Sequence, residues 1–104
     1  MSQEKQNVQN TIEVVRENTE LFYQQKTQEA YVKMQDTINY ILQAVEALNQ
    51  YAVSHEGFAV DSQRLVTSLT EAMNAMEEKD EILLADILEY DFVEYLQELS
   101  EEME

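Results

Sequence analysis

The chain contains no cysteine, no proline and a single glycine, Gly57. Without cysteine, a disulfide framework, a thiolate metal site and a cysteine nucleophile are all excluded. The tight turns of β-sheets depend on Gly, Pro and Asn-Gly pairs. A chain of 104 residues with almost none of these is therefore expected to consist of a few long helices. Its Glu, Gln, Ala, Leu and Met residues are good helix formers and favour the same class.

Basic residues and long apolar runs are also scarce. Six basic residues stand against 22 acidic ones, which gives a formal net charge of −16. Because this charge repels nucleic-acid phosphates and anionic membranes, the expected partner is instead a protein with a basic surface. The first ten residues are polar, unlike a signal peptide, and no apolar run approaches the roughly 18 residues that span a bilayer. We therefore expect a cytoplasmic protein that binds neither nucleic acid nor membrane.

Apolar residues recur at helical spacing in four segments, at about 5–24, 28–53, 58–77 and 81–100. Polar stretches near 25–27, 54–57 and 78–80 separate them. For the third segment, Asp61 or Ser62 is also a candidate cap, which places the start of the helix after Phe58. The length corresponds to one domain, residues 1–104. We predict an all-α fold, an antiparallel up-down four-helix bundle made of two helical hairpins with short polar turns. No Gly or Pro enforces the first break, so one continuous helix from about Val8 to Ala52 is the alternative.

The last predicted helix differs from the others because it is apolar over most of its circumference. One face carries Leu84, Leu88, Phe92, Tyr95, Leu96 and Leu99, and the opposite side carries Ile82, Leu83, Ile87, Tyr90 and Val93. A helix of this kind usually has neighbours on more than one side. Either it lies centrally in the bundle, or part of its surface is left for a partner.

Acidic charge is concentrated around the same helix. Residues 71–104 hold 13 acids and one base, a net −12, whereas residues 1–70 hold nine acids and five bases, a net −4. A solvated surface explains these acids without any partner, but such a patch also steers a basic partner onto exposed apolar residues. The second reading predicts a partner-binding surface formed by Leu83, Asp86, Ile87, Tyr90, Asp91 and Glu94. The same apolar surface predicts self-association, so a homo-oligomer is also expected.

No constellation of residues indicates catalysis, a cofactor or a metal ion. His55 is the only histidine, and beside Glu56 in a predicted loop it lacks the positioned partner that a general base needs. The di-metal sites of four-helix bundles use Glu-x-x-His pairs, which the chain does not contain. EF-hand loops and phosphate-binding loops need glycines at positions where this chain has none. We predict a protein that is not an enzyme.

The segment EKDEILLADILEYD, residues 78–91, and the segment LFYQQ, residues 21–25, carry a resemblance. They resemble segments of short, acidic, uncharacterised bacterial helical-bundle proteins, some of which are encoded near motility genes. The resemblance covers about half of the chain. It implies an accessory or export-chaperone role in flagellar assembly and no assigned chemistry.

The sequence therefore favours a non-catalytic protein-interaction module, such as an adaptor or an export-chaperone-like accessory protein. The alternative is an acidic nucleic-acid mimic that inhibits a DNA-binding protein. A mimic needs carboxylates spaced like phosphates, whereas the acids of the last helix are interleaved with Leu, Ile and Tyr. This spacing favours the interaction module.

Overall fold

The computed structural model describes residues 2–104, which form four helices and no strand. The fourth helix is continuous but contains a π-helical stretch, so it is divided into α4, η1 and α5. The elements are α1 (Gln3–Tyr23), α2 (Thr27–Ser54), α3 (Ser62–Glu77), α4 (Glu81–Asp86), η1 (Ile87–Val93) and α5 (Glu94–Glu102). The predicted all-α class is confirmed, and the break after Tyr23 shows that 8–52 is two helices.

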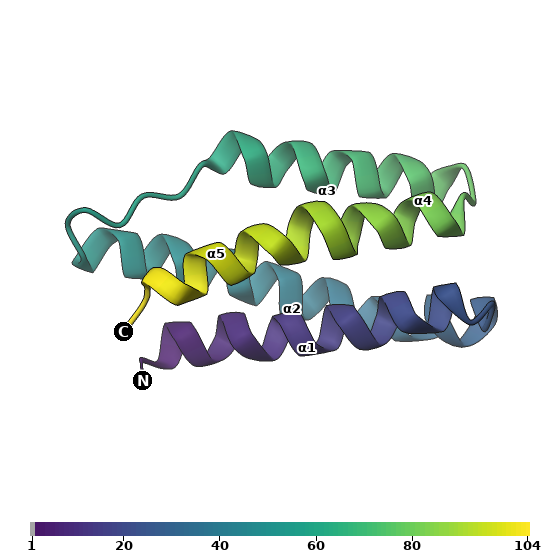
Figure 1. Cartoon of the computed structure of the whole chain (residues 1–104), viewed down its shortest axis with the longest axis horizontal. Coiled ribbons are helices and arrows are strands. Elements are labelled where there is room, and N and C mark those ends of the chain that lie inside the picture. The colour runs from purple at the N-terminus through teal and green to yellow at the C-terminus, as the bar shows by residue number, and fades with distance from the viewer. Residues whose placement is uncertain (1) are drawn as a thin grey trace.

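The helices lie side by side along one long axis, with both ends of the chain at the same end of the molecule (Figure 1). Helices α1 and α2 form one contacting pair, and α3 pairs with α4 and η1. The fourth helix lies between α1 and α3 and contacts both along its length. Helix α2, in contrast, packs extensively only on α1 and has almost no close backbone approach to α3. The seam between α2 and α3 is therefore the loosest in the fold.

Both tight turns between helices place a non-glycine residue in the left-handed conformation. Gln25 has φ 61° and Lys79 has φ 56°. At the first turn the N–H of Lys26 donates to the carbonyl of Leu21 at 2.9 Å. This is the Schellman arrangement, whose left-handed position usually carries glycine. Because neither turn has glycine there, the sequence alone did not decide whether the first two helices were separate.

The third helix begins later than its predicted bounds, at the alternative start that Asp61 caps. The prediction begins it at residue 58, but α3 begins at Ser62, and residues 55–61 form a loop longer than the turn expected at 54–57. The Asp61 carboxylate accepts from the N–H of Arg64 at 3.1 Å and so caps the helix. Phe58 precedes the cap and packs edge-on against Tyr51, with ring centroids 4.8 Å apart. Phe58 therefore packs on the core from the loop, and its apolar side chain was taken as part of the helical pattern.

The π-helical stretch η1 was not expected, but its cause is visible in the sequence. Leu84, Leu88, Phe92 and Leu96 are all buried and recur every four residues. An α-helical turn takes about 3.6 residues, so an unbroken α-helix would rotate this stripe by about 120° between Leu84 and Leu96. The wider turns of a π-helix offset the drift. The η1 stretch thus keeps all four side chains facing one core.

The central position of the fourth helix explains its apolar circumference. Its second face is partly buried too, since Ile87 is 7% exposed and Val93 is fully buried. Leu83 and Tyr90 remain 45% and 59% exposed. The helix is therefore central in the bundle and still leaves apolar side chains on the surface.

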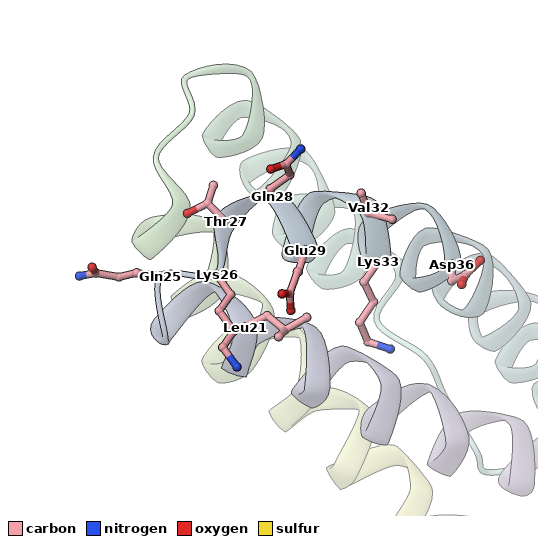
Figure 2. Close-up of a pocket in the computed structure, with 9 residues that line it drawn as sticks. All are labelled: Leu21, Gln25, Lys26, Thr27, Gln28, Glu29, Val32, Lys33 and Asp36. Atoms are coloured by element: carbon pink, nitrogen blue, oxygen red, sulfur yellow. The ribbon is translucent and has the colours of Figure 1, made fainter.

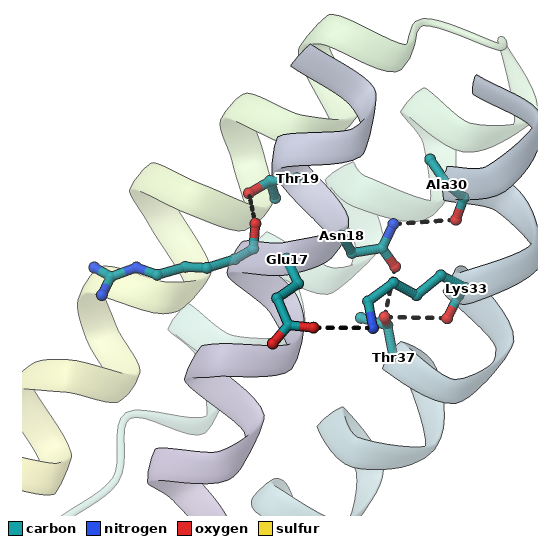
Figure 3. Close-up of polar contacts among 7 residues, drawn as sticks. Glu17, Asn18, Thr19, Ala30, Lys33 and Thr37 are labelled. Atoms are coloured by element: carbon teal, nitrogen blue, oxygen red, sulfur yellow. Dashed lines mark hydrogen bonds and ion pairs between the residues drawn. The ribbon is translucent and has the colours of Figure 1, made fainter. Parts of the chain in front are cut away.

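A buried polar network determines how α1 lies against α2 (Figure 3). The Asn18 side chain is fully buried, and its Nδ2 donates to the carbonyl of Ala30 at 3.0 Å. The Thr37 hydroxyl donates to Asn18 Oδ1. At the edge of the network the Glu17 carboxylate lies 3.4 Å from Lys33 Nζ. Because a buried amide needs hydrogen-bond partners, the network favours one register between the two helices.

Candidate functional site

A hollow lies between α3 and the first half of the fourth helix, and we call it the α3–α4 hollow. Five of the six predicted partner-binding residues meet there. The lining consists of Leu83, Asp86, Ile87, Tyr90 and Asp91 from α4 and η1, of Glu71, Asn74 and Ala75 from α3, and of Glu78 from the turn after α3. The sixth predicted residue, Glu94, is exposed but does not line the hollow.

The α3–α4 hollow combines apolar side chains with charge of one sign. Leu83 and Tyr90 are its exposed apolar groups. Its acids are Glu71, Glu78, Asp86 and Asp91, and the lining includes no basic residue. Tyrosine suits an interface because it offers apolar area together with a hydroxyl. The surface is complementary to a basic partner with some apolar area of its own.

The structure corrects the expected exposure of Ile87. The side chain is only 7% exposed and lies beside α3 in the hollow, instead of standing on the open surface. The sequence pattern placed it on the face away from the core stripe, and that assignment did not allow for α3 packing on η1. A partner would reach only the edge of Ile87, so Leu83 and Tyr90 supply the accessible apolar area.

Asp86 is held by a contact from α1. The Tyr23 hydroxyl donates to Asp86 Oδ1 at 2.6 Å. Burial, and then the hydrogen bond to Asp86 and the negative charge of that carboxylate, raise the pKa of Tyr23 far above its usual value. Tyr23 therefore stays protonated at neutral pH and remains a donor. One turn further along the fourth helix, Glu89 Oε1 lies 3.5 Å from Arg16 Nε of α1. Two polar contacts therefore join α1 to the fourth helix.

A second depression, which we call the α2–α3 groove, lies along the loose seam between these helices. All of its lining side chains are apolar, and they are Met34, Ile38, Ile41, Leu42, Leu69, Ala72, Met73, Met76 and Leu88. An adjoining depression shares Leu42 and Leu69 and continues to Val45 and Val53. The sequence analysis missed the groove because periodicity shows which residues share a face, but not whether a neighbouring helix covers that face.

A third hollow, at the turn between α1 and α2, carries mixed charge (Figure 2). Its lining includes Lys26 and Lys33 as well as Glu29 and Asp36. Figure 2 shows that Gln25 and the neighbouring side chains point in different directions and do not converge. Lys33 is already paired with a carboxylate of α1. Nothing in this hollow selects a ligand.

His55 lines a small hollow together with Glu56, Glu102 and Glu104. Its ring stacks on Tyr51 with centroids 3.7 Å apart, and Nδ1 lies 3.0 Å from the Tyr51 carbonyl oxygen. Within residues 2–104, no carboxylate hydrogen-bonds to the imidazole, so no acid–base pair is in place. The same residues include no group of three or more His, Asp or Glu placed to hold a metal ion.

Comparison with known proteins identifies the family of the chain. Residues 1–102 match the sequence model of a family described as a domain of unknown function (DUF8042). No curated protein and no solved structure matches the chain. Across the described residues, every helix is too short or too polar to cross a membrane.

Proposed function

The chain belongs to the DUF8042 family, and we propose that it is a non-catalytic protein-interaction module that binds a basic protein surface. The observation that carries the proposal is the α3–α4 hollow, where exposed Leu83 and Tyr90 are surrounded by carboxylates. The acids attract a basic partner and orient it, while burial of Leu83 and Tyr90 supplies affinity. The proposal involves no cofactor, metal, nucleic acid or membrane.

The setting we propose for this activity is a single cytoplasmic domain folded as an antiparallel up-down bundle of two helical hairpins. Within it, the chain acts as an adaptor or an export-chaperone-like accessory protein. Two observations support this narrower role. The 78–91 segment that carries the resemblance to motility-associated helical proteins also supplies six of the nine residues that line the hollow, including Tyr90 and Asp91. The hollow also includes residues of η1, and π-helical stretches are frequent at functional sites.

The proposal is tested by affinity capture from the native cell with two baits, the wild-type chain and the Leu83→Ser/Tyr90→Ser double variant. Mass spectrometry is expected to find a protein with a basic surface that only the wild type retains. The matched control is Ile82→Ser/Tyr40→Ser, which changes side chains that are 51% and 39% exposed but lie outside the hollow. Equal retention of every protein by wild type and double variant would contradict the proposal.

The identity of the retained protein separates the narrower roles. A flagellar export substrate supports the chaperone role. Retention of only DNA-binding proteins, released by added DNA, supports the nucleic-acid mimic instead. A partner whose binding is unaltered by DNA counts against the mimic.

Self-association through the hollow is the other form that binding can take. Two copies would bring two sets of carboxylates together, and like charges oppose that contact. A basic partner is therefore favoured over a second copy. Light scattering at micromolar concentration distinguishes them, because a dimer that Leu83→Ser dissociates would make the second copy the occupant of the hollow.

A further inference from the structure

We propose that the α2–α3 groove is a second docking site, and that its occupant is a basic amphipathic helix of another protein. The inference goes beyond the proposed function, because a different surface with different residues carries it. The two sites use different residues of α3. Leu69, Met73 and Met76 line the groove, whereas Glu71 and Asn74 line the hollow. Each proposal can therefore fail without the other.

The groove exists because the apolar stripe of α2 is wider than the area that α1 covers. The small residues Ala30, Ala44 and Ala47 are buried and allow α2 to approach its neighbour closely. This orientation leaves Ile38 38% exposed and Leu42 61% exposed at the seam with α3. Contiguous uncovered apolar surface on a protein is a usual mark of an interaction site.

The lining determines what kind of segment fits. Leu88 is buried at 1% exposure and Ala72 at 4%, while Leu42 and Met73 stand 61% and 59% exposed beside them. No side chain of the lining offers a hydrogen-bond partner. An extended strand or loop would bring in backbone N–H and C=O groups that find no partner there, which is costly. A helix satisfies these groups internally and inserts side chains at i, i+3 or i+4, and i+7 into such a groove.

The surroundings of the groove determine the charge of the occupant. Lys33 and Arg64 are the basic residues of α2 and α3, and both are paired with carboxylates of other helices, Glu17 and Glu98. Glu46 lines the depression that adjoins the groove, and Glu77 follows Met73 by one turn of α3; in the described residues, no ion pair involves either acid. The polar face of the occupant is therefore rich in Lys and Arg. A second copy, itself at −16, is the poorer match.

Three methionines make the groove adaptable. Met34, Met73 and Met76 contribute flexible thioether side chains to its walls. Methionine is overused at surfaces that accept several partners, because its unbranched chain repacks against differently shaped side chains. We therefore expect the groove to bind helices of different sequence, provided that each has an apolar face and a basic face.

The test uses a fluorescent synthetic peptide built from Leu and Lys with the apolar spacing of a helix, measured by anisotropy at about 0.15 M salt. The matched peptide has the same composition and charge in a scrambled order without an apolar face. We expect the amphipathic peptide to bind at least tenfold more tightly than the scrambled one. Leu42→Ser/Met73→Ser should weaken its binding about tenfold or more, since each change removes apolar burial. Both residues are largely exposed, so the fold is expected to survive, and circular dichroism checks this.

The control variant is Val32→Ser/Val66→Ser, which alters α2 and α3 at side chains 70% and 55% exposed outside the groove. It should change the affinity less than twofold. Equal binding of the two peptides, or unchanged binding by Leu42→Ser/Met73→Ser, overturns the inference. Loss of binding in Leu83→Ser/Tyr90→Ser alone assigns the peptide to the α3–α4 hollow and overturns the groove only. If the wild type forms a dimer and Leu42→Ser/Met73→Ser dissociates it, the occupant of the groove is a second copy, and the inference is also overturned.

Discussion

Among single residues, Asn18 contributes most clearly to the pairing of α1 with α2. It is the only fully buried amide side chain in the described part of the chain, and it hydrogen-bonds to Ala30 and Thr37 across the helix pair. Its position on the buried face also shows why the network escaped sequence analysis. An asparagine between Val15 and Phe22 on an apolar stripe has no local signal for its partner, because that partner lies on the next helix.

We predict that Asn18→Ala lowers the free energy of unfolding by about 1–3 kcal/mol, because it leaves a void, removes the hydrogen bond to Ala30 and leaves the buried Thr37 hydroxyl only the Lys33 carbonyl as acceptor. Urea denaturation measures the change as a shift of the midpoint at constant slope. Asn10→Ala is the matched control, since Asn10 is exposed on the same helix. Its effect should be near zero or slightly stabilising, as alanine is the better helix former. Equal effects of the two substitutions would mean that the network contributes nothing.

Tyr23 gives a pH dependence with a definite sign. Burial and the contact with Asp86 raise its pKa in the folded chain above the ordinary value of 10.0. Above that pH the unfolded chain loses the proton first, so the folded chain binds more protons and stability falls as pH rises. The contribution is complete below pH 10 and is lost above it. Burial also raises the pKa of Tyr31, so part of the pH dependence remains in any variant of Tyr23.

The expected result is that stability between about pH 9 and pH 11 falls less steeply in Tyr23→Phe than in the wild type. Urea midpoints measured across this range provide the comparison. Tyr40→Phe is the control, because Tyr40 is on another helix and has no part in the contact with Asp86. Parallel curves for wild type and Tyr23→Phe would show that the contact does not hold the hydroxyl proton.

At the level of the helices, each of the two tight turns has a non-glycine residue, Gln25 or Lys79, at a left-handed position where glycine is more stable. Left-handed backbone costs a non-glycine residue about 1–2 kcal/mol, part of which glycine gives back through the entropy of the unfolded chain. Gln25→Gly and Lys79→Gly should therefore each raise the free energy of unfolding by about 0.5–1 kcal/mol. Thermal denaturation measures the gain. Gln24→Gly is the control, since Gln24 has φ −80° and gains nothing from glycine. Destabilisation by all three changes would contradict the assigned turn conformations.

The all-helical class was predictable, because the near-absence of Gly and Pro leaves no other class, but the number of helices was not, since no Gly or Pro marks the break after Tyr23. The faces were less predictable. For α2, periodicity predicts one broad apolar stripe. In the structure Ala44 and Ala47 are buried whereas Ile38 is partly exposed, because α1 packs closely on the side of α2 that carries the alanines. That approach is a property of two helices together. The α2–α3 groove follows from the same packing and could not be read from either helix alone.

The α3–α4 hollow was partly predictable for a related reason. Leu83, Tyr90 and Asp91 were found because their residue types combine charge with apolar area on one segment. Ile87 was placed on the surface because a fixed α-helical period was assumed, and because the cover supplied by α3 is not visible in the sequence. Glu71 and Glu78 were missed as members of the hollow, since they come from the preceding helix and from the turn that follows it.

For the whole molecule, net charge is the dominant electrostatic property. The chain carries −16, and only three ion pairs occur within residues 2–104, so added salt removes more repulsion than attraction. The melting temperature should therefore rise as NaCl increases from about 0.01 M to 0.5 M, by roughly 4–8 °C for each kcal/mol of repulsion relieved. Differential scanning calorimetry measures the rise. A melting temperature that is constant or falls with salt would show that the acids are balanced by attractive contacts.

We propose that this chain binds another protein through the α3–α4 hollow, where Leu83 and Tyr90 are exposed among acidic residues. The most direct measurement is quantitative capture from native-cell extract with wild-type, Leu83→Ser/Tyr90→Ser and Ile82→Ser/Tyr40→Ser baits in parallel. We expect a basic protein that the wild-type and Ile82→Ser/Tyr40→Ser baits retain equally and that the Leu83→Ser/Tyr90→Ser bait does not retain. The same proteins in the same amounts on all three baits would contradict it.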